Sequence, residues 1–174
     1  MTAITFALTC MEAIALWAIL ATVALTSILS GSQGFGLTRL SLPFLLGTFV
    51  VGNRHRAMLW GSILYAIGAF LFAFFYFVLM AHLGQANWWV GAITGTLHGL
   101  FLLVAVLPVL PHMHPRMASE YDGPIGERRL EPPGFLGLNY GYRTPFTTIV
   151  GHAVYGALLG AGFAQPLAAF WSGA

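Results

Sequence analysis

The chain has 174 residues, of which 58% are hydrophobic and 7% are charged, and its formal net charge is +2. Soluble domains have roughly 25% charged residues, so this composition excludes a water-soluble globular protein and predicts one integral membrane domain over residues 1–174. The small net charge gives no indication of a nucleic-acid partner. Cys10 is the single cysteine, so an internal disulfide is excluded.

The first long apolar stretch covers residues 6–29. A helix needs about 20 apolar residues to cross a membrane. A signal peptide has an apolar core of only about 7–15 residues, preceded by basic residues that are missing here. We therefore expect a retained membrane-spanning helix. Glu12 lies about one turn inside it and can reach the membrane surface, so its position does not favour a proton carrier.

The first loop, residues 30–56, includes an apolar segment at 40–52 that is too short to span a membrane. Pro43 and Gly47 would suit a broken, re-entrant half-helix. We favour the simpler alternative, a short helix that lies at the cytoplasmic membrane surface.

The second apolar stretch, residues 57–82, has aromatic rings at nearly every angle around a helix: Phe70, Phe72, Phe74, Phe75, Tyr76 and Phe77. Three sister helices cannot cover all of these rings, so some must face lipid, a tetrapyrrole or quinone, or another subunit. Lipid is the simplest interpretation, and a protein partner is the next because aromatic residues are enriched at interface cores. Phe74 and Phe75 are the candidate lipid or partner contacts on this helix.

Two further apolar stretches, residues 89–110 and 146–170, complete a predicted all-α fold with four membrane-spanning helices. The short connection 83–88 makes the second and third helices neighbours. Glycines recur at four-residue spacing in both later helices, at Gly91, Gly95 and Gly99 and at Gly156 and Gly160. Small residues at this spacing let two backbones approach closely. We therefore expect a compact four-helix bundle in which the third and fourth helices are in contact.

His98 and His152 lie inside the third and fourth predicted spans, on glycine-rich faces. Ionisable residues within a span usually face the bundle interior and are candidates for function. These two suit a hydrogen bond between helices, or ligation of haem iron or of the magnesium in a chlorophyll-type pigment. A haem with two histidine ligands needs both rings at similar depth, and helix rise places them about 6 Å apart. We therefore favour hydrogen bonding.

His112, Met113 and His114 form a Pro-His-Met-His-Pro motif at the end of the third span. Imidazole and thioether groups are suitable ligands for copper, which makes these residues a candidate metal site. Two histidines in an HxH motif supply too few ligands for a closed site. We favour the alternative, a helix end whose histidines meet the last carbonyls or lipid phosphates.

The second loop, residues 111–145, is rich in proline, which excludes a long helix there. Its segment 131–145 is too apolar for a disordered tail, so we expect a long ordered loop that packs on the bundle or on a partner through Phe135 and Tyr140. Four acids lie in this loop: Glu120, Asp122, Glu127 and Glu131. They would suit a paired-carboxylate site, but neighbouring arginines are the closer explanation.

Every arginine lies in one of the two loops, and the chain has no lysine. The arginines are Arg39, Arg54, Arg56, Arg116, Arg128, Arg129 and Arg143. Positive charge beside a span is retained on the cytoplasmic side of the membrane, so we predict that both loops are cytoplasmic and both chain ends lie outside. Arg54, Arg56 and Arg116 are then placed for contact with lipid headgroups or a partner.

The segments GAITGTLHGLFLLVAVLP, HMHPRM and GHAVYGALLGAGF together resemble a loose group of small uncharacterised bacterial inner-membrane proteins. A late His-x-x-Tyr-Gly-x-x-x-Gly helix recurs in that group, and it is matched here by His152, Tyr155, Gly156 and Gly160. The resemblance covers the last half of the chain. It implies a multi-pass protein of a bacterial inner membrane and no particular activity.

The sequence has no nucleophile–base arrangement, phosphate-binding glycine loop or Cys-x-x-Cys pair. We therefore predict no catalytic residue, no enzyme activity and no soluble substrate. Instead we expect a non-catalytic accessory subunit of a larger membrane complex of the respiratory, photosynthetic or oxidase type, with other membrane subunits and lipids as partners. The alternatives are a protein that binds a tetrapyrrole or a metal through its histidines, and a small transporter, which the lack of an inverted repeat disfavours.

Overall fold

The computed structural model describes residues 3–118 and 130–172. Within these ranges the chain is helical, and the only strand-like pairing is a single bridge between Met117 and Leu130. Four helical segments are long and apolar enough to cross a membrane: Ala7–Gly34, Arg54–Leu83, Trp88–Met113 and Thr144–Trp171. The prediction of an all-α, multi-pass membrane protein with four spanning helices is confirmed at this level.

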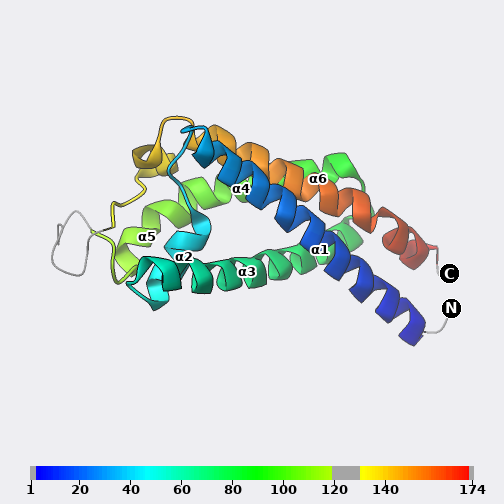
Figure 1. The fold of residues 1–174 in the computed structure, drawn as a ribbon. Coiled ribbons are helices and arrows are strands. Elements are labelled where there is room, and N and C mark those ends of the chain that lie inside the picture. The colour runs from blue at the N-terminus through cyan, green and yellow to red at the C-terminus, as the bar shows by residue number, and fades with distance from the viewer. Residues whose placement is uncertain (1–2, 119–129, 173–174) are drawn as a thin grey trace. The chain divides into compact units, whose positions relative to one another are not determined.

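Figure 1 shows the helices in chain order, coloured from blue at the N-terminal end to red at the C-terminal end. The elements are α1 (Ala3–Gly34), α2 (Leu42–Val50), α3 (Arg54–Leu83), α4 (Trp88–Phe101), a π-helical turn (Leu102–Val106), α5 (Leu107–Met113), a 3-10 segment (Phe135–Tyr140) and α6 (Thr144–Trp171). α4, the π-helical turn and α5 follow one another without a break and make up the third span.

The chain divides into two compact units, each of which is described by itself. The first unit consists of Met1–Ser27, Gly68–His98 and Val150–Ala174, and the second of Ile28–Ile67 and Gly99–Ile149. All of the arginines belong to the second unit, so the first unit contains neither arginine nor lysine.

α1 is longer than the predicted first span, because it ends at Gly34 and not near residue 29. Gly36 follows the helix with φ +69°, a conformation that glycine adopts without strain. Its N–H donates to the carbonyl of Gln33, and the N–H of Leu37 donates to that of Ser32, both at 2.9 Å. This pair of bonds is the Schellman arrangement that closes many helices. The helix therefore stops where a glycine permits this turn.

The predicted short apolar helix is present as α2, in the second unit. The Ser41 hydroxyl accepts a hydrogen bond from Phe44 N–H at its start. A Cβ on Gly47 would lie 1.7 Å from the carbonyl oxygen of Ala57, and one on Gly61 would lie 1.6 Å from that of Pro43. α2 thus packs directly on the backbone of α3, and only glycine at both positions leaves room for this contact.

The third span departs from a regular α-helix near its end. The N–H of Leu107 donates to the carbonyl of Leu102, one residue further back than in an α-helix. Pro108 and Pro111 follow and have no N–H to donate. The helix ends at Met113, just beyond the predicted end of this span at residue 110.

In the first unit, α4 and α6 approach backbone to backbone at the predicted glycines. A Cβ on Gly91 would lie 2.0 Å from the carbonyl oxygen of Gly156, and one on Gly95 would lie 2.0 Å from that of His152. A Cβ on Gly160 would lie 2.2 Å from the carbonyl oxygen of Asn87. Such contacts bring the helices close where no hydrophobic effect drives their association. The third glycine of the predicted stripe, Gly99, is buried and belongs to the second unit.

The second unit has an apolar core formed by Leu40, Leu45, Leu103, Leu107, Met117 and Tyr140. Tyr140 was predicted to pack on the bundle or to contact a partner or lipid, and within this unit the residue is buried in the core. Its hydroxyl donates to the carbonyl of Glu131 at 2.6 Å. Burial, together with the Glu131 carboxylate, raises the pKa of Tyr140 to about 12, so the hydroxyl remains a hydrogen-bond donor.

Part of the second loop lies outside the described residues, and with it Glu120, Asp122, Glu127, Arg128 and Arg129. In the described part of this loop, Leu130 forms the bridge with Met117 and Phe135–Tyr140 form the 3-10 segment. Its remaining acid, Glu131, pairs at 3.1 Å with Arg39 of the first loop. The same arginine donates to the carbonyl of Asn139 at 2.5 Å.

Candidate functional site

A cluster of rings lies inside the first unit, on α3, α4 and α6: Phe72, Tyr76, His98, His152 and Tyr155. Phe72 and Tyr76 are four residues apart on α3, and His152 and Tyr155 are three apart on α6, so each pair shares one helix face. Tyr76, His152 and Tyr155 are buried, and His98 is partly buried.

The His98 imidazole lies at the centre of this ring cluster. Its Nδ1 is 3.3 Å from the hydroxyl oxygen of Tyr76. Phe72 packs on the imidazole with 4.0 Å between ring centroids and 30° between planes, and His152 meets it edge to face at 4.9 Å and 76°. Tyr155 contacts the Tyr76 ring at 5.7 Å and donates its hydroxyl hydrogen to the carbonyl of Ala69. Three helices are thereby joined through polar groups.

The two histidine rings are closer than helix rise alone suggested. That reasoning separated them by about 6 Å in depth, whereas their centroids are 4.9 Å apart. The glycine contact between Gly95 and the His152 carbonyl brings the two backbones together one turn from His98. Because the two backbones are so close, the His98 and His152 side chains can meet even though their Cα atoms lie at different depths along the helices.

The ring cluster does not suit a tetrapyrrole held between its histidines. A metal ion lies about 2 Å from a ligating imidazole nitrogen, and a macrocycle bound between two imidazoles must separate them by its own thickness. Here the His98 and His152 rings contact each other directly, and Phe72 covers a face of His98. The arrangement instead provides hydrogen bonding and ring packing in a low-dielectric environment, where such bonds are strengthened.

A second polar cluster lies in the second unit, around His114. This residue is buried at the end of α5. Its Nδ1 accepts the backbone N–H of Arg116 at 3.1 Å, so the proton of the neutral ring lies on Nε2. Nε2 faces the carbonyl of Leu45 at 3.2 Å and the hydroxyl of Thr48 at 3.1 Å. The imidazole therefore holds α2 through two of its residues.

Arg116 reinforces this attachment of α2. Its Nη1 donates to the carbonyl of Thr48 at 2.6 Å and to that of Phe49 at 3.2 Å. The last carbonyls of a helix lack partners within the helix, and a cation near them is favourable. Arg116 was predicted to contact lipid or a partner, and this stays a prediction; within the chain the partly buried guanidinium bonds to α2.

The predicted metal residues do not converge on one point. Met113 is 71% exposed and His112 is also exposed, whereas His114 is buried and has hydrogen-bond partners at both ring nitrogens. Among the described residues, no three side chains of His, Cys, Asp or Glu are grouped so that they could hold a metal ion. The Pro-His-Met-His-Pro motif therefore ends a helix and attaches α2 in this structure.

The titration of His114 gives a testable pH dependence. Burial lowers the pKa of His114 below its ordinary value, and the Arg116 guanidinium lowers it further against the opposing hydrogen bond to Leu45. The unfolded chain then takes up the proton at a higher pH than the folded chain does. We expect the free energy of unfolding in detergent to fall as the pH decreases below about 6.5.

The His114→Gln variant provides the comparison for this prediction. It should lose the part of the slope that corresponds to a single proton, while the background slope from the other histidines stays. Chemical denaturation at several pH values measures both slopes. Equal slopes in the two proteins would show that the folded state does not disfavour protonation of His114.

The remaining predicted contact residues lie on the surface. Phe74 is 48% exposed and Phe75 is 65% exposed, both on α3. Arg54, Arg56 and Phe135 are also exposed. These side chains are available for lipid or for a partner.

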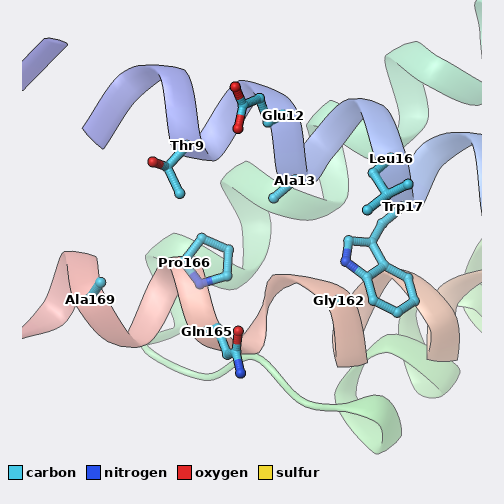
Figure 2. Close-up of a pocket in the computed structure, with 9 residues that line it drawn as sticks. All are labelled: Thr9, Glu12, Ala13, Leu16, Trp17, Gly162, Gln165, Pro166 and Ala169. Atoms are coloured by element: carbon cyan, nitrogen blue, oxygen red, sulfur yellow. The ribbon is translucent and has the colours of Figure 1, made fainter. Parts of the chain in front are cut away.

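A groove in the first unit was not found by sequence analysis. It lies between α1 and α6 (Figure 2) and is lined by Thr9, Glu12, Ala13, Leu16, Trp17, Gly162, Gln165, Pro166 and Ala169. Its volume is about 420 Å³. Glu12 was noticed as a charge within a span, but the groove depends on Trp17 reaching Gly162 of another helix, and no local pattern indicates that contact.

Comparison with known proteins adds no relative, since no family model, curated protein or solved structure matches this chain.

Proposed function

We propose that the chain is a non-catalytic accessory subunit of a larger membrane complex, and that it lies in a bacterial inner membrane with its arginine-bearing loops in the cytoplasm. The observation that supports this function is the outward face of α3. Large apolar side chains of the first unit are exposed along this face: Phe70, Leu71, Phe74, Phe75 and Val78. We call this set the α3 face.

The opposite side of α3 packs within the chain, and in the first unit Ala69, Ala73, Tyr76 and Met80 are buried there. Phe72 and Phe77 also contact rings of other helices, whereas Phe74 and Phe75 lie on the outward face. Rigid aromatic rings supply a large contact area at low entropic cost, and they are enriched at the centres of protein interfaces.

The polar groups inside the spans also suit a structural role. Tyr76 and His98 lie within hydrogen-bonding distance of each other, and Tyr155 donates to the carbonyl of Ala69. Such bonds between helices satisfy groups that would otherwise be costly in hydrocarbon. They stabilise the chain as a scaffold, and the α3 face is left for recognition.

Co-purification in a mild detergent tests this function. The tagged chain should be recovered with one or more other membrane proteins in a fixed ratio. The double variant Phe74→Leu, Phe75→Leu should lose at least about 90% of them, because loss of interface hot spots costs about 2 kcal/mol or more. Leucine is equally apolar, so contact with lipid and the stability of the chain should be unchanged.

Phe101→Leu is the matched control for this experiment. Phe101 lies on α4 and is 57% exposed, so the same chemical change is made on another helix. Its recovery of partners should equal that of the unchanged chain. Recovery of the unchanged chain alone, as a stable monomer, would argue decisively against an accessory role.

A further inference from the structure

The groove between α1 and α6 has the size and lining of a small-molecule site. Its volume of about 420 Å³ lies within the range of about 300–1,000 Å³ that is usual for ligand pockets, and such pockets are mainly apolar with a few polar groups. Here Leu16, Ala13 and Pro166 supply apolar walls, and Glu12 and Gln165 supply polar groups.

The groove exists because large and small residues face each other across it. Figure 2 shows Trp17 reaching from α1 toward Gly162 on α6. A Cβ on Gly162 would lie 2.1 Å from the indole ring, so the ring fills the space of a side chain. Further along the groove, the lining consists of Ala13 on α1 and of Pro166 and Ala169 on α6. These side chains are too small to fill the space between the two helices. Pro166 also has no N–H to donate to the carbonyl of Gly162, one turn earlier in α6.

Glu12 is the unusual residue of this groove. It is the only acid within the four candidate spans. Among the described residues, no hydrogen-bond donor and no cation contacts its carboxylate. The first unit contains no arginine or lysine that could act as a counter-ion. An ionised carboxylate costs about 2.5–3.5 kcal/mol at the centre of a span and less toward its end, where Glu12 lies, so a cation from outside the chain would offset this smaller cost.

The surroundings of Glu12 select among cations. The Trp17 indole offers a face for an organic ammonium, and the apolar walls offer contact for a hydrocarbon body. The Thr9 hydroxyl donates to the carbonyl of Thr5 at 3.0 Å, which leaves its lone pairs free to accept. A phospholipid headgroup would also bring a phosphate, and the first unit has no arginine or lysine to pair with it. The chemistry favours a single positive charge without an anion.

We propose that this groove is a binding site for a hydrophobic organic monocation, in which Glu12 supplies the counter-ion, Trp17 packs against the cation, and Leu16 and Pro166 contact the apolar body. The site opens between two membrane-spanning helices, so such a ligand can enter from the lipid, where its apolar body concentrates it.

Binding of tetraphenylphosphonium to the full chain in nanodiscs of zwitterionic lipid tests the site. Saturable binding of one cation per chain is expected. Glu12→Gln should weaken it several-fold, because the variant removes the counter-ion. Glu12→Asp should retain it within a few-fold. Trp17→Leu should weaken it about two- to fivefold through the lost cation–π contact.

Two controls separate this site from simple partitioning. Tetraphenylborate has the same shape and the opposite charge, and it should not bind saturably. Glu131→Gln removes a carboxylate of the second unit and should leave the affinity for the cation unchanged. Saturable binding that is equal in the Glu12→Gln variant, binding of the anion at the same site, or no saturable binding would each overturn the proposal. The proposal would also be overturned if the Glu12→Gln variant lost its co-purifying proteins but still bound the cation.

Discussion

Replacement of Gly156 by alanine is expected to force α4 away from α6 and to destabilise the first unit severely. The added methyl group would lie 2.0 Å from the carbonyl oxygen of Gly91 and 2.9 Å from the nitrogen of Gly95. Both obstacles are backbone atoms, so no change of rotamer can relieve them. Overpacking of a well-packed contact costs about 1–3 kcal/mol, and occasionally more.

The cost for Gly156→Ala should lie at the upper end of that range, because two helices must separate and the rings of His98 and His152 then lose contact. Reversible unfolding in detergent measures this loss as a change in the free energy of unfolding. An unchanged free energy of unfolding would mean that α4 and α6 do not pack through their glycines.

Gly68→Ala is the matched control for the glycine contact. Gly68 lies within α3, and no atom outside its own helix backbone lies within 4 Å of the position that a Cβ would take. The same substitution there should stabilise the chain by about 0.5–1 kcal/mol, since alanine loses less backbone entropy than glycine on forming a helix. The two substitutions should therefore change stability in opposite directions.

Replacement of Arg116 by methionine is expected to release α2 from the end of the third span. Methionine keeps an apolar stem of similar length but removes the donors to the carbonyls of Thr48 and Phe49. A hydrogen bond from a charged group contributes about 1.5–3 kcal/mol. Opening of α2 should then become about 10- to 100-fold more frequent. Hydrogen exchange at residues 45–51 measures this directly.

Arg143→Met is the appropriate control for the Arg116 variant. The Arg143 guanidinium lies over the Tyr142 ring at 5.2 Å. Arg143 is exposed and makes no hydrogen bond to α2. Exchange at residues 45–51 should remain at its original rate in this variant. If the Arg116 variant also leaves it unchanged, the Arg116 hydrogen bonds do not contribute to holding α2.

The sequence was sufficient to predict the four spans because apolar length decides whether a helix can cross a membrane. The first span was predicted too short because residues 30–34 are polar, whereas helix termination depends on the backbone conformation of Gly36. Four-residue glycine spacing indicated close helix contact, and close contact at Gly91 and Gly156 is present in the first unit.

The details of the candidate site could not be predicted in the same way. Whether His98 reaches His152 depends on the angle and distance at which α4 and α6 cross. The rise per residue along a single helix does not determine that crossing. Tyr140 and Tyr142 lie two residues apart in one loop, yet one is buried and the other exposed. That difference arises from the turn at Gly141, with φ +129°, and composition alone does not distinguish the two rings.

The most direct test of the proposed accessory function is photo-cross-linking from the α3 face in intact cells. A photoreactive phenylalanine analogue at position 75 should give one discrete cross-linked protein of another sequence. The same analogue at position 101 of α4, also an exposed phenylalanine, should give mainly lipid adducts. Lipid adducts alone from both positions, or cross-links from position 75 only to a second copy of this chain, would contradict the account.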